Sequence, residues 1–261
     1  MNNTLVKGIA VLELLAHSDR PLSLTQIATE LNIVKSNVHR LMQALVEMRY
    51  VLRHEESCGY SASIKLWELG TAVLGKLDLR RHAEQQMNRL LESTGETVHL
   101  SILDREEVVY VHKLESLHPV RAYTQIGGRV PAHTVATGKA LLAYRSQAAL
   151  LELSKQLESY TSTTIVDSVL FLKDMKKIRM QGYAISRGEW RENVWGIAAA
   201  ILGTNGAAIA AVGISGPAAR IRKRGLQGSA MLVNAAATAI SEKLGGAARL
   251  DTLLNLGRRA A

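Results

Sequence analysis

Five hydrogen-bonding residues begin one short segment near the start of the chain: Lys35, Ser36, Asn37, His39 and Arg40. The apolar residues that follow recur at helical spacing, which predicts an amphipathic helix in the first half of residues 35–54. Short donors and acceptors at the first turns of a helix can reach the base edges and phosphates of a DNA duplex. This segment is therefore a candidate recognition helix, although the residues do not show which side chains would read bases and which would hold phosphates.

The helices and strands predicted around this segment indicate the fold of the domain that carries it. Residues 4–17 have the apolar spacing of a helix, and Ser23 with Gln26 forms a capping box for a second helix that Asn32 ends. Two short extended pieces, residues 50–54 and 59–63, follow the candidate helix and are joined by the turn residues EESCG. Together they predict a winged helix–turn–helix, in which Thr25 and Arg53 would also face DNA. The alternative is a solvated helix face in a small domain that binds protein.

A second candidate site is the stretch TVATGKALLA, which contains Gly138 and Lys139. It is not a nucleotide-binding P-loop, because His133 stands at the first glycine position and Ala140 follows the lysine. The stretch instead predicts a loop that enters a helix. The free backbone amides of Ala136, Thr137 and Gly138 at the start of that helix can receive a carboxylate.

The pattern around this site changes from helical to extended. A long, mostly helical passage covers residues 64–93, and strands are predicted at 97–104, 108–116, 120–127, 183–189, 194–202 and 207–216. A tight turn at residues 204–206 joins the last two strands, and helices are predicted at 173–182 and 225–246. Strands flanked by helices predict an α+β fold with an antiparallel sheet.

Six stretches together resemble the IclR family of transcriptional regulators: LSLTQIATELNIVKSNVHRLMQALVEMRYVLR, GYSASIKLWELG, GETVHLSILDREEVVYVHKLES, GGRVPAHTVATGKALLA, RMQGYAISRGE and AAVGISGPAARI. The resemblance covers nearly the whole chain. It implies a winged helix–turn–helix DNA-binding domain at residues 1–62, a linker helix at 63–80, a profilin- or GAF-like sensor domain at 81–250 and a tail at 251–261. It also implies a homodimer or homotetramer that binds a pseudo-palindromic operator on double-stranded DNA, more often as a repressor than as an activator.

The resemblance also places a small-molecule effector in the sensor domain. The positions that match the family's effector contacts are Ala122, Ala136, Thr137, Gly138, Ser186, Val194, Gly196, Gly213 and Ser215. The chain departs from the family pattern at Arg49, where glycine is usual, and at Ser186, Gly196 and Ala200, where aspartate, cysteine and proline are common. Glycines at 196 and 213, with Trp190 and Trp195 near them, favour a larger effector, such as an aromatic or longer-chain carboxylic acid.

Composition and charge limit the remaining classes of function. The chain has 261 residues and a formal net charge of +9, but residues 1–60 carry six basic and six acidic side chains, so the excess lies elsewhere. The single cysteine, Cys58, excludes an internal disulfide and favours a reducing compartment, and no apolar run is long enough to span a bilayer. The histidines lack metal-ligand spacing and no nucleophile motif is present, so we expect a cytoplasmic non-enzyme without metal or cofactor.

Overall fold

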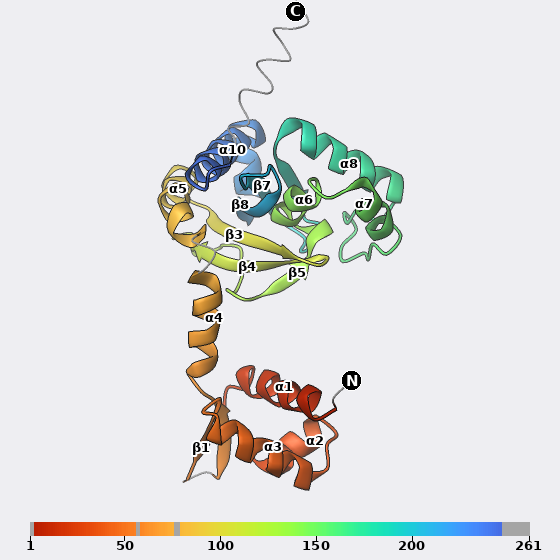
Figure 1. Cartoon of the computed structure of the whole chain (residues 1–261). Helices are drawn as coiled ribbons and strands as arrows, with labels where there is room; N and C mark the ends of the chain where they lie inside the picture. Colours follow the sequence, from red (N-terminus) through yellow and green to blue (C-terminus); the bar gives the residue numbers. More distant parts are fainter. Residues whose placement is uncertain (1–2, 56–57, 76–78, 247–261) are drawn as a thin grey trace, which may run out of the picture. The chain divides into compact units, whose positions relative to one another are not determined.

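The computed structural model describes residues 3–55, 58–75 and 79–246, and the chain divides into two compact units, residues 1–77 and 78–261 (Figure 1). The expected linker, residues 63–80, spans this division. It contains α4 (Lys65–Gly75) and the first residues of α5 (Leu79–Thr94). In this segment Trp67 is exposed, and the side chains of Leu74 and Leu77 lie outside the described residues.

The first unit holds three helices and a two-stranded sheet. These are α1 (Asn3–Ala16), α2 (Leu24–Glu30), α3 (Lys35–Glu47), β1 (Val51–His54) and β2 (Gly59–Ala62). The two strands pair antiparallel, and backbone hydrogen bonds between Leu22 and Tyr60 join the hairpin to the turn before α2. Val11, Ile27 and Val38, one from each helix, are fully buried in the shared core. In α1 the side chains of Val11 and Leu15 are buried, whereas those of Leu5 and Ile9 are exposed.

Local capping fixes where these helices begin and end. The predicted capping box is present: Ser23 Oγ accepts from the Gln26 amide, and Gln26 Oε1 accepts from the Ser23 amide. Asn32 ends the second helix with a φ of 50°. Arg49 takes a φ of 62°, the left-handed conformation that glycine usually supplies after a helix, at a cost of roughly 1–2 kcal/mol. The Tyr50 amide bonds the Leu45 carbonyl beyond it, so α3 ends sharply before the first strand.

The second unit is built on a six-stranded antiparallel sheet of order β5-β4-β3-β8-β7-β6. Its strands are β3 (Thr97–Asp104), β4 (Glu107–Leu114), β5 (Arg129–Pro131), β6 (Ala184–Arg187), β7 (Val194–Leu202) and β8 (Ala208–Pro217). The predicted turn joins β7 to β8, and Gly206 takes a φ of 74° there. The α+β fold class predicted from the sequence is therefore confirmed.

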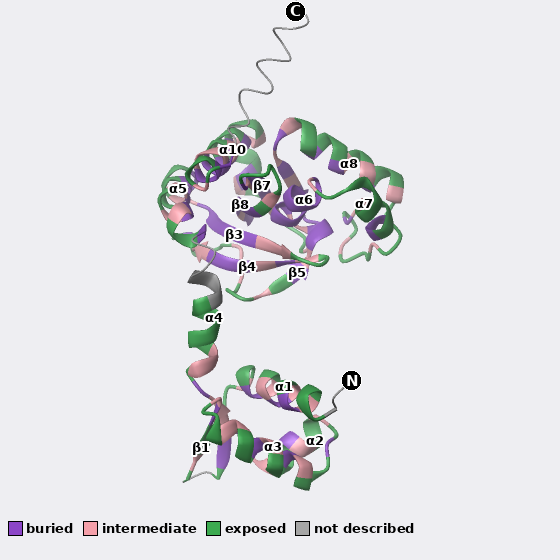
Figure 2. Cartoon of the chain, in the orientation of Figure 1, coloured by how far each residue is buried: buried purple, intermediate pink, exposed green. Residues whose placement is uncertain are grey.

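Helices cover both faces of this sheet (Figure 1). On one face lie α5 and α10 (Leu226–Lys243). On the other lie α6 (Ala136–Leu142) and α8 (Ser168–Gln181), with α7 (Gln147–Ser154) packed against α8. The short helices η1 (Ala132–Thr134) and α9 (Ala218–Arg224) follow β5 and β8 directly. The buried band in Figure 2 runs through the sheet and the inner sides of these helices.

The strand predicted at residues 120–127 is wrong. This stretch is a loop, and the edge strand that pairs with the outer side of β4 is the three-residue β5. The loop is tied at separate points: Lys113 Nζ donates to the Thr124 carbonyl, and the Gly127 amide donates to the Tyr110 carbonyl. Because these contacts leave most of its backbone outside the sheet, the loop can turn several side chains toward the second unit's interior.

Candidate functional site

The candidate recognition helix is α3, and its first turns are open to solvent. Lys35, Ser36, His39 and Arg40 are exposed, and Asn37 is half-buried. Arg40 Nη2 donates to Asn37 Oδ1 at 2.5 Å, which aligns the two side chains on the same face. Val34 precedes the helix without a side-chain cap, so the start of α3 is free to receive a phosphate oxygen. The buried residues Val38 and Met42 hold the opposite face against the core.

The other two predicted DNA contacts lie on neighbouring elements of the same unit. Thr25 is exposed on α2, and its carbonyl accepts from the Thr29 hydroxyl. Arg53 is exposed on β1 of the hairpin. The arrangement can present one helix to a groove and a cation on the wing to the backbone, as winged helices do.

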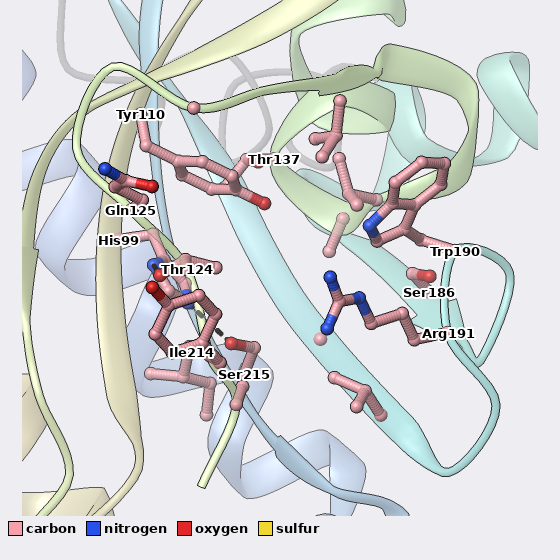
Figure 3. Close-up of a pocket in the computed structure, with 18 of the residues that line it drawn as sticks. His99, Tyr110, Thr124, Gln125, Thr137, Ser186, Trp190, Arg191, Ile214 and Ser215 are labelled. Atoms are coloured by element: carbon pink, nitrogen blue, oxygen red, sulfur yellow. Dashed lines mark hydrogen bonds between the residues drawn. The ribbon is translucent and has the colours of Figure 1, made fainter. Parts of the chain in front are cut away.

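A cavity of about 400 Å³ opens in the second unit between the sheet, the start of α6 and two loops (Figure 3). Seven of the nine predicted effector positions line it: Ala122, Ala136, Thr137, Ser186, Val194, Gly196 and Ser215. Ala122 lies on the 120–127 loop rather than on a strand. Glycine at 196 allows α6 to approach, because a Cβ there would lie 3.3 Å from the Ala136 Cβ. The Ser186 hydroxyl donates to the Thr134 carbonyl at 2.7 Å and so fixes the turn before α6.

The two remaining positions do not line the cavity. Gly138 packs against η1, where a Cβ would overlap the backbone of Ala132. A Cβ at Gly213 would lie 2.6 Å from both the Ala198 Cβ and the Ile197 carbonyl oxygen. Both glycines therefore serve close packing, and the expectation that Gly213 opens space in the cavity is wrong.

Of the two tryptophans that favoured a larger effector, Trp190 lines the cavity and Trp195 does not. The Trp190 ring packs against Tyr160 with centroids 4.7 Å apart. Trp195 lies elsewhere: the Arg187 and Arg222 guanidiniums contact its ring, at 5.8 and 5.3 Å from the centroid.

A hydrogen-bonded chain crosses one side of the cavity. His99 Nε2 lies 2.5 Å from Ser215 Oγ, and His99 Nδ1 lies 3.3 Å from Thr124 Oγ1. Burial, with a smaller contribution from the Lys113 charge, lowers the pKa of His99 to about 4, so the ring is neutral near pH 7.

A neutral imidazole donates from one nitrogen and accepts at the other. One of the two hydroxyls, Ser215 or Thr124, must therefore donate to His99, and the other keeps its hydrogen for a ligand. The chain can offer a donor on either side, according to the tautomer.

Lys139 is buried, which the sequence does not predict. Its side chain is 1% exposed, and Nζ lies 2.5 Å from Glu189 Oε2 and 3.0 Å from Asp174 Oδ2. Burial raises the pKa of Glu189, while Lys139 opposes that shift by favouring the charged form. The pair joins α6 to the loop between β6 and β7, and each of these elements contributes residues to the cavity lining.

Comparison with known proteins decides the family. The model of the bacterial transcriptional regulator IclR C-terminal domain matches residues 71–242, and the IclR helix-turn-helix domain matches residues 4–55. The chain belongs to the IclR family of transcriptional regulators. Both domains predicted from the sequence resemblance are thus present: a DNA-binding helix-turn-helix and a C-terminal effector-binding domain.

Relatives that match over at least nine tenths of both chains support this assignment. The HTH-type transcriptional regulator KdgR of Escherichia coli K12 is 34% identical over 93% of both chains. The HTH-type transcriptional repressor AllR of the same strain is 31% identical over 92% of this chain and 90% of its own. These relatives are regulators and not enzymes, in agreement with the expectation for this IclR-family chain.

Solved structures agree in fold. The Thermotoga maritima IclR structure has a TM-score of 0.79 at 30% identity and covers 94% of this chain and all of its own. An IclR homologue from Microbacterium hydrocarbonoxydans, complexed with 4-hydroxybenzoate, has a TM-score of 0.82 at 23% identity, covers 93% of this chain and 99% of its own, and shares the fold.

The sequence did not predict the other residues that line this cavity of the IclR-family chain. They are His99, Tyr110, Arg121, Tyr123, Thr124, Gln125, Gly128, Arg129, Val130, Val135, Arg191 and Ile214. Those on β3, β4 and β8 come from strands covered on both faces, where alternation cannot distinguish a cavity from a core. Among the described residues, no cluster of three His, Cys, Asp or Glu side chains has the arrangement of a metal site, and no helix is long and apolar enough to cross a membrane.

Proposed function

We propose that this regulator is a repressor that binds a pseudo-palindromic operator in the cytoplasm as a homodimer or homotetramer, and that a small organic acid in the cavity releases it. The observation that carries the proposal is the cavity itself, because most of the positions expected to contact an effector meet around one space of about 400 Å³. That volume suits a compact, ring-sized ligand. The proposal that the regulator represses rather than activates is supported by its relative AllR, which is named a transcriptional repressor.

The charge of the lining favours an acid. Its members include three arginines, Arg121, Arg129 and Arg191, but no aspartate or glutamate. The apolar surfaces of Trp190, Val135 and Ile214 provide a place for a hydrocarbon or aromatic body. The homologue that was solved with 4-hydroxybenzoate supports the choice of aromatic acids as the first compounds to test.

Control of DNA binding follows from differential affinity. A ligand lowers the occupancy of the operator only if it binds the DNA-free arrangement more tightly than the DNA-bound one. We propose that the acid favours the arrangement of the two units that does not match the spacing of the operator half-sites.

The DNA half of the proposal is tested by selecting duplexes from a random-sequence pool with the full chain and measuring affinity by fluorescence anisotropy. Replacing Arg40 with alanine should weaken binding of the selected duplex about tenfold, because one base or phosphate contact is lost. Arg89→Ala, which removes one positive charge from the exposed face of α5, is the matched control and should change affinity little. Unchanged affinity in Arg40→Ala would overturn the assignment of α3.

The effector half is tested by thermal denaturation of the full chain with glyoxylate, pyruvate, benzoate and 4-hydroxybenzoate. A ligand that binds only the folded protein raises the melting midpoint as its concentration increases. A rise with the ring-sized acids supports the proposal. A rise confined to glyoxylate and pyruvate would contradict the expected size of the effector, and no rise with any acid would contradict an acid effector altogether.

A further inference from the structure

The three arginines that line the cavity are not equivalent. Arg129 is paired, with Nη2 at 2.6 Å from Asp104 and Nε at 2.8 Å from Glu107. Arg121 Nη2 lies 3.4 Å from Glu115. Within the part of the chain that the structure describes, Arg191 has no such carboxylate. The neutral His99 adds no positive charge, so the guanidinium of Arg191 is the uncompensated charge of this lining.

The Tyr110 hydroxyl lies on the same side of the cavity as the Arg191 guanidinium (Figure 3). Tyr110 is 7% exposed, and no described residue forms a hydrogen bond with its hydroxyl. In Figure 3 the hydroxyl points into the cavity on the side that the Arg191 guanidinium also enters. Burial raises the pKa of Tyr110 to about 12, with the nearby Arg191 charge opposing the shift, so the group is an O–H donor near pH 7. A hydroxyl that opens into the cavity without a protein partner, beside an exposed cation without a carboxylate, is an arrangement that an anionic oxygen would complete.

The backbone that carries Arg191 is held firmly. Three threonine hydroxyls donate to three successive carbonyl oxygens just before it: Thr163 to Arg187, Thr161 to Gly188 and Thr164 to Glu189. The Glu189 carboxylate is in turn paired with the buried Lys139 of α6. These contacts hold the backbone of residues 187–189 in place. The backbone of Trp190 and Arg191, which follows directly, is therefore positioned as a preorganised binding site requires.

We propose that Arg191 and Tyr110 form the subsite that selects the effector, by binding its carboxylate while the apolar body of the acid lies against Trp190. This inference rests on the proposed function, since it names the group that the acid effector must carry and the residues that recognise it. Arg191 supplies the charge and paired N–H donors, and Tyr110 donates its hydroxyl to the same carboxylate. The neutral amide of the same acid offers no charge to Arg191 and adds a second set of N–H donors there.

The test uses matched pairs of probes, benzoate with benzamide and 4-hydroxybenzoate with 4-hydroxybenzamide, and measures binding to the full chain by calorimetry. The wild type should bind each acid more tightly than its amide. Arg191→Leu should weaken acid binding about 10- to 100-fold and remove the preference for the acid, as expected for loss of a charge-assisted contact. Arg191→Lys should restore part of that preference, and Tyr110→Phe should weaken acid binding several-fold.

The matched control is Arg89→Leu, which removes an equal charge from the exposed face of α5, at a residue outside the cavity lining. Its acid affinity should stay within about threefold of the wild type, and melting of each ligand-free variant checks folding. Wild-type binding of an acid together with an unchanged affinity in Arg191→Leu would overturn the subsite while leaving the acid effector intact. Failure of the wild type to bind either acid would refute the aromatic-acid effector, and the subsite with it.

Discussion

The buried His99 should make the stability of the sensor domain sensitive to acid. Its side chain is 3% exposed, both ring nitrogens contact hydroxyls, and Lys113 lies close enough to disfavour a second positive charge. In the unfolded chain the imidazole regains its ordinary pKa of 6.5, whereas in the folded chain the pKa is about 4. Protons therefore bind the unfolded state first as the pH falls.

The direction and size of the effect follow from this difference. Because the folded pKa is depressed, the stability is fully present above pH 6.5 and is lost as the pH falls toward 4. A shift from 6.5 to about 4 corresponds to a maximum of about 3 kcal/mol, of which about 2 kcal/mol should be lost by pH 5. His112 and His133 also have lowered pKa values owing to burial, so only the difference between variants isolates His99.

The assay is urea unfolding of the full chain, followed by tryptophan fluorescence at pH 7 and pH 5. The free energy of unfolding should fall less between these two pH values in His99→Gln than in the wild type, by about 2 kcal/mol. His118→Gln, at an exposed position in the same unit, is the control and should follow the wild type. Equal acid sensitivity in wild type and His99→Gln would refute the reasoning.

Two further predictions concern packing in the second unit. Replacing Lys139 with methionine leaves the Glu189 carboxylate buried without its cation. The free energy of unfolding in urea at pH 7 should then fall by about 3–5 kcal/mol. A fall below about 1 kcal/mol would show that the pair contributes little to stability. Gly213→Ala should lower the free energy of unfolding by about 1–3 kcal/mol, because the new Cβ would overlap Ala198. Its control is Gly228→Ala, where the new Cβ meets nothing within 4 Å. An unchanged melting midpoint in Gly213→Ala would mean that the two strands can separate at this point.

Interactions between residues close in the sequence determine most of the first unit's helix ends and turns, so the sequence alone predicts them. Ser23 with Gln26, and Asn32, act through hydrogen bonds and backbone conformations that lie within a few residues. The turn with Gly206 in the second unit is local in the same way. The apolar face of α1 was less predictable: Leu5 and Ile9 have suitable spacing but stay exposed, because burial depends on which neighbours reach that end of the helix.

The cavity depends on contacts between distant segments, and sequence patterns do not contain them. Lys139 has the sequence context of an exposed helical lysine, yet it is buried because Glu189 and Asp174 approach from elsewhere in the chain. The loop at 120–127 has the alternation of a strand, but its hydrogen bonds reach β4 at only a few points. The family resemblance located seven lining positions, whereas Arg191 and Tyr110 became candidates only once three-dimensional proximity was known.

The central claim is that an acid bound in this cavity controls DNA binding. The most direct measurement is fluorescence anisotropy of the full chain on its selected duplex, titrated with the aromatic acid that most raises the melting midpoint. The wild type should release the duplex as acid is added, whereas Ser215→Leu, which fills the cavity beside His99, should bind the duplex normally and keep it. Release of the duplex from both proteins at the same acid concentration would contradict the account, as would a wild type that binds the acid and holds its DNA unchanged.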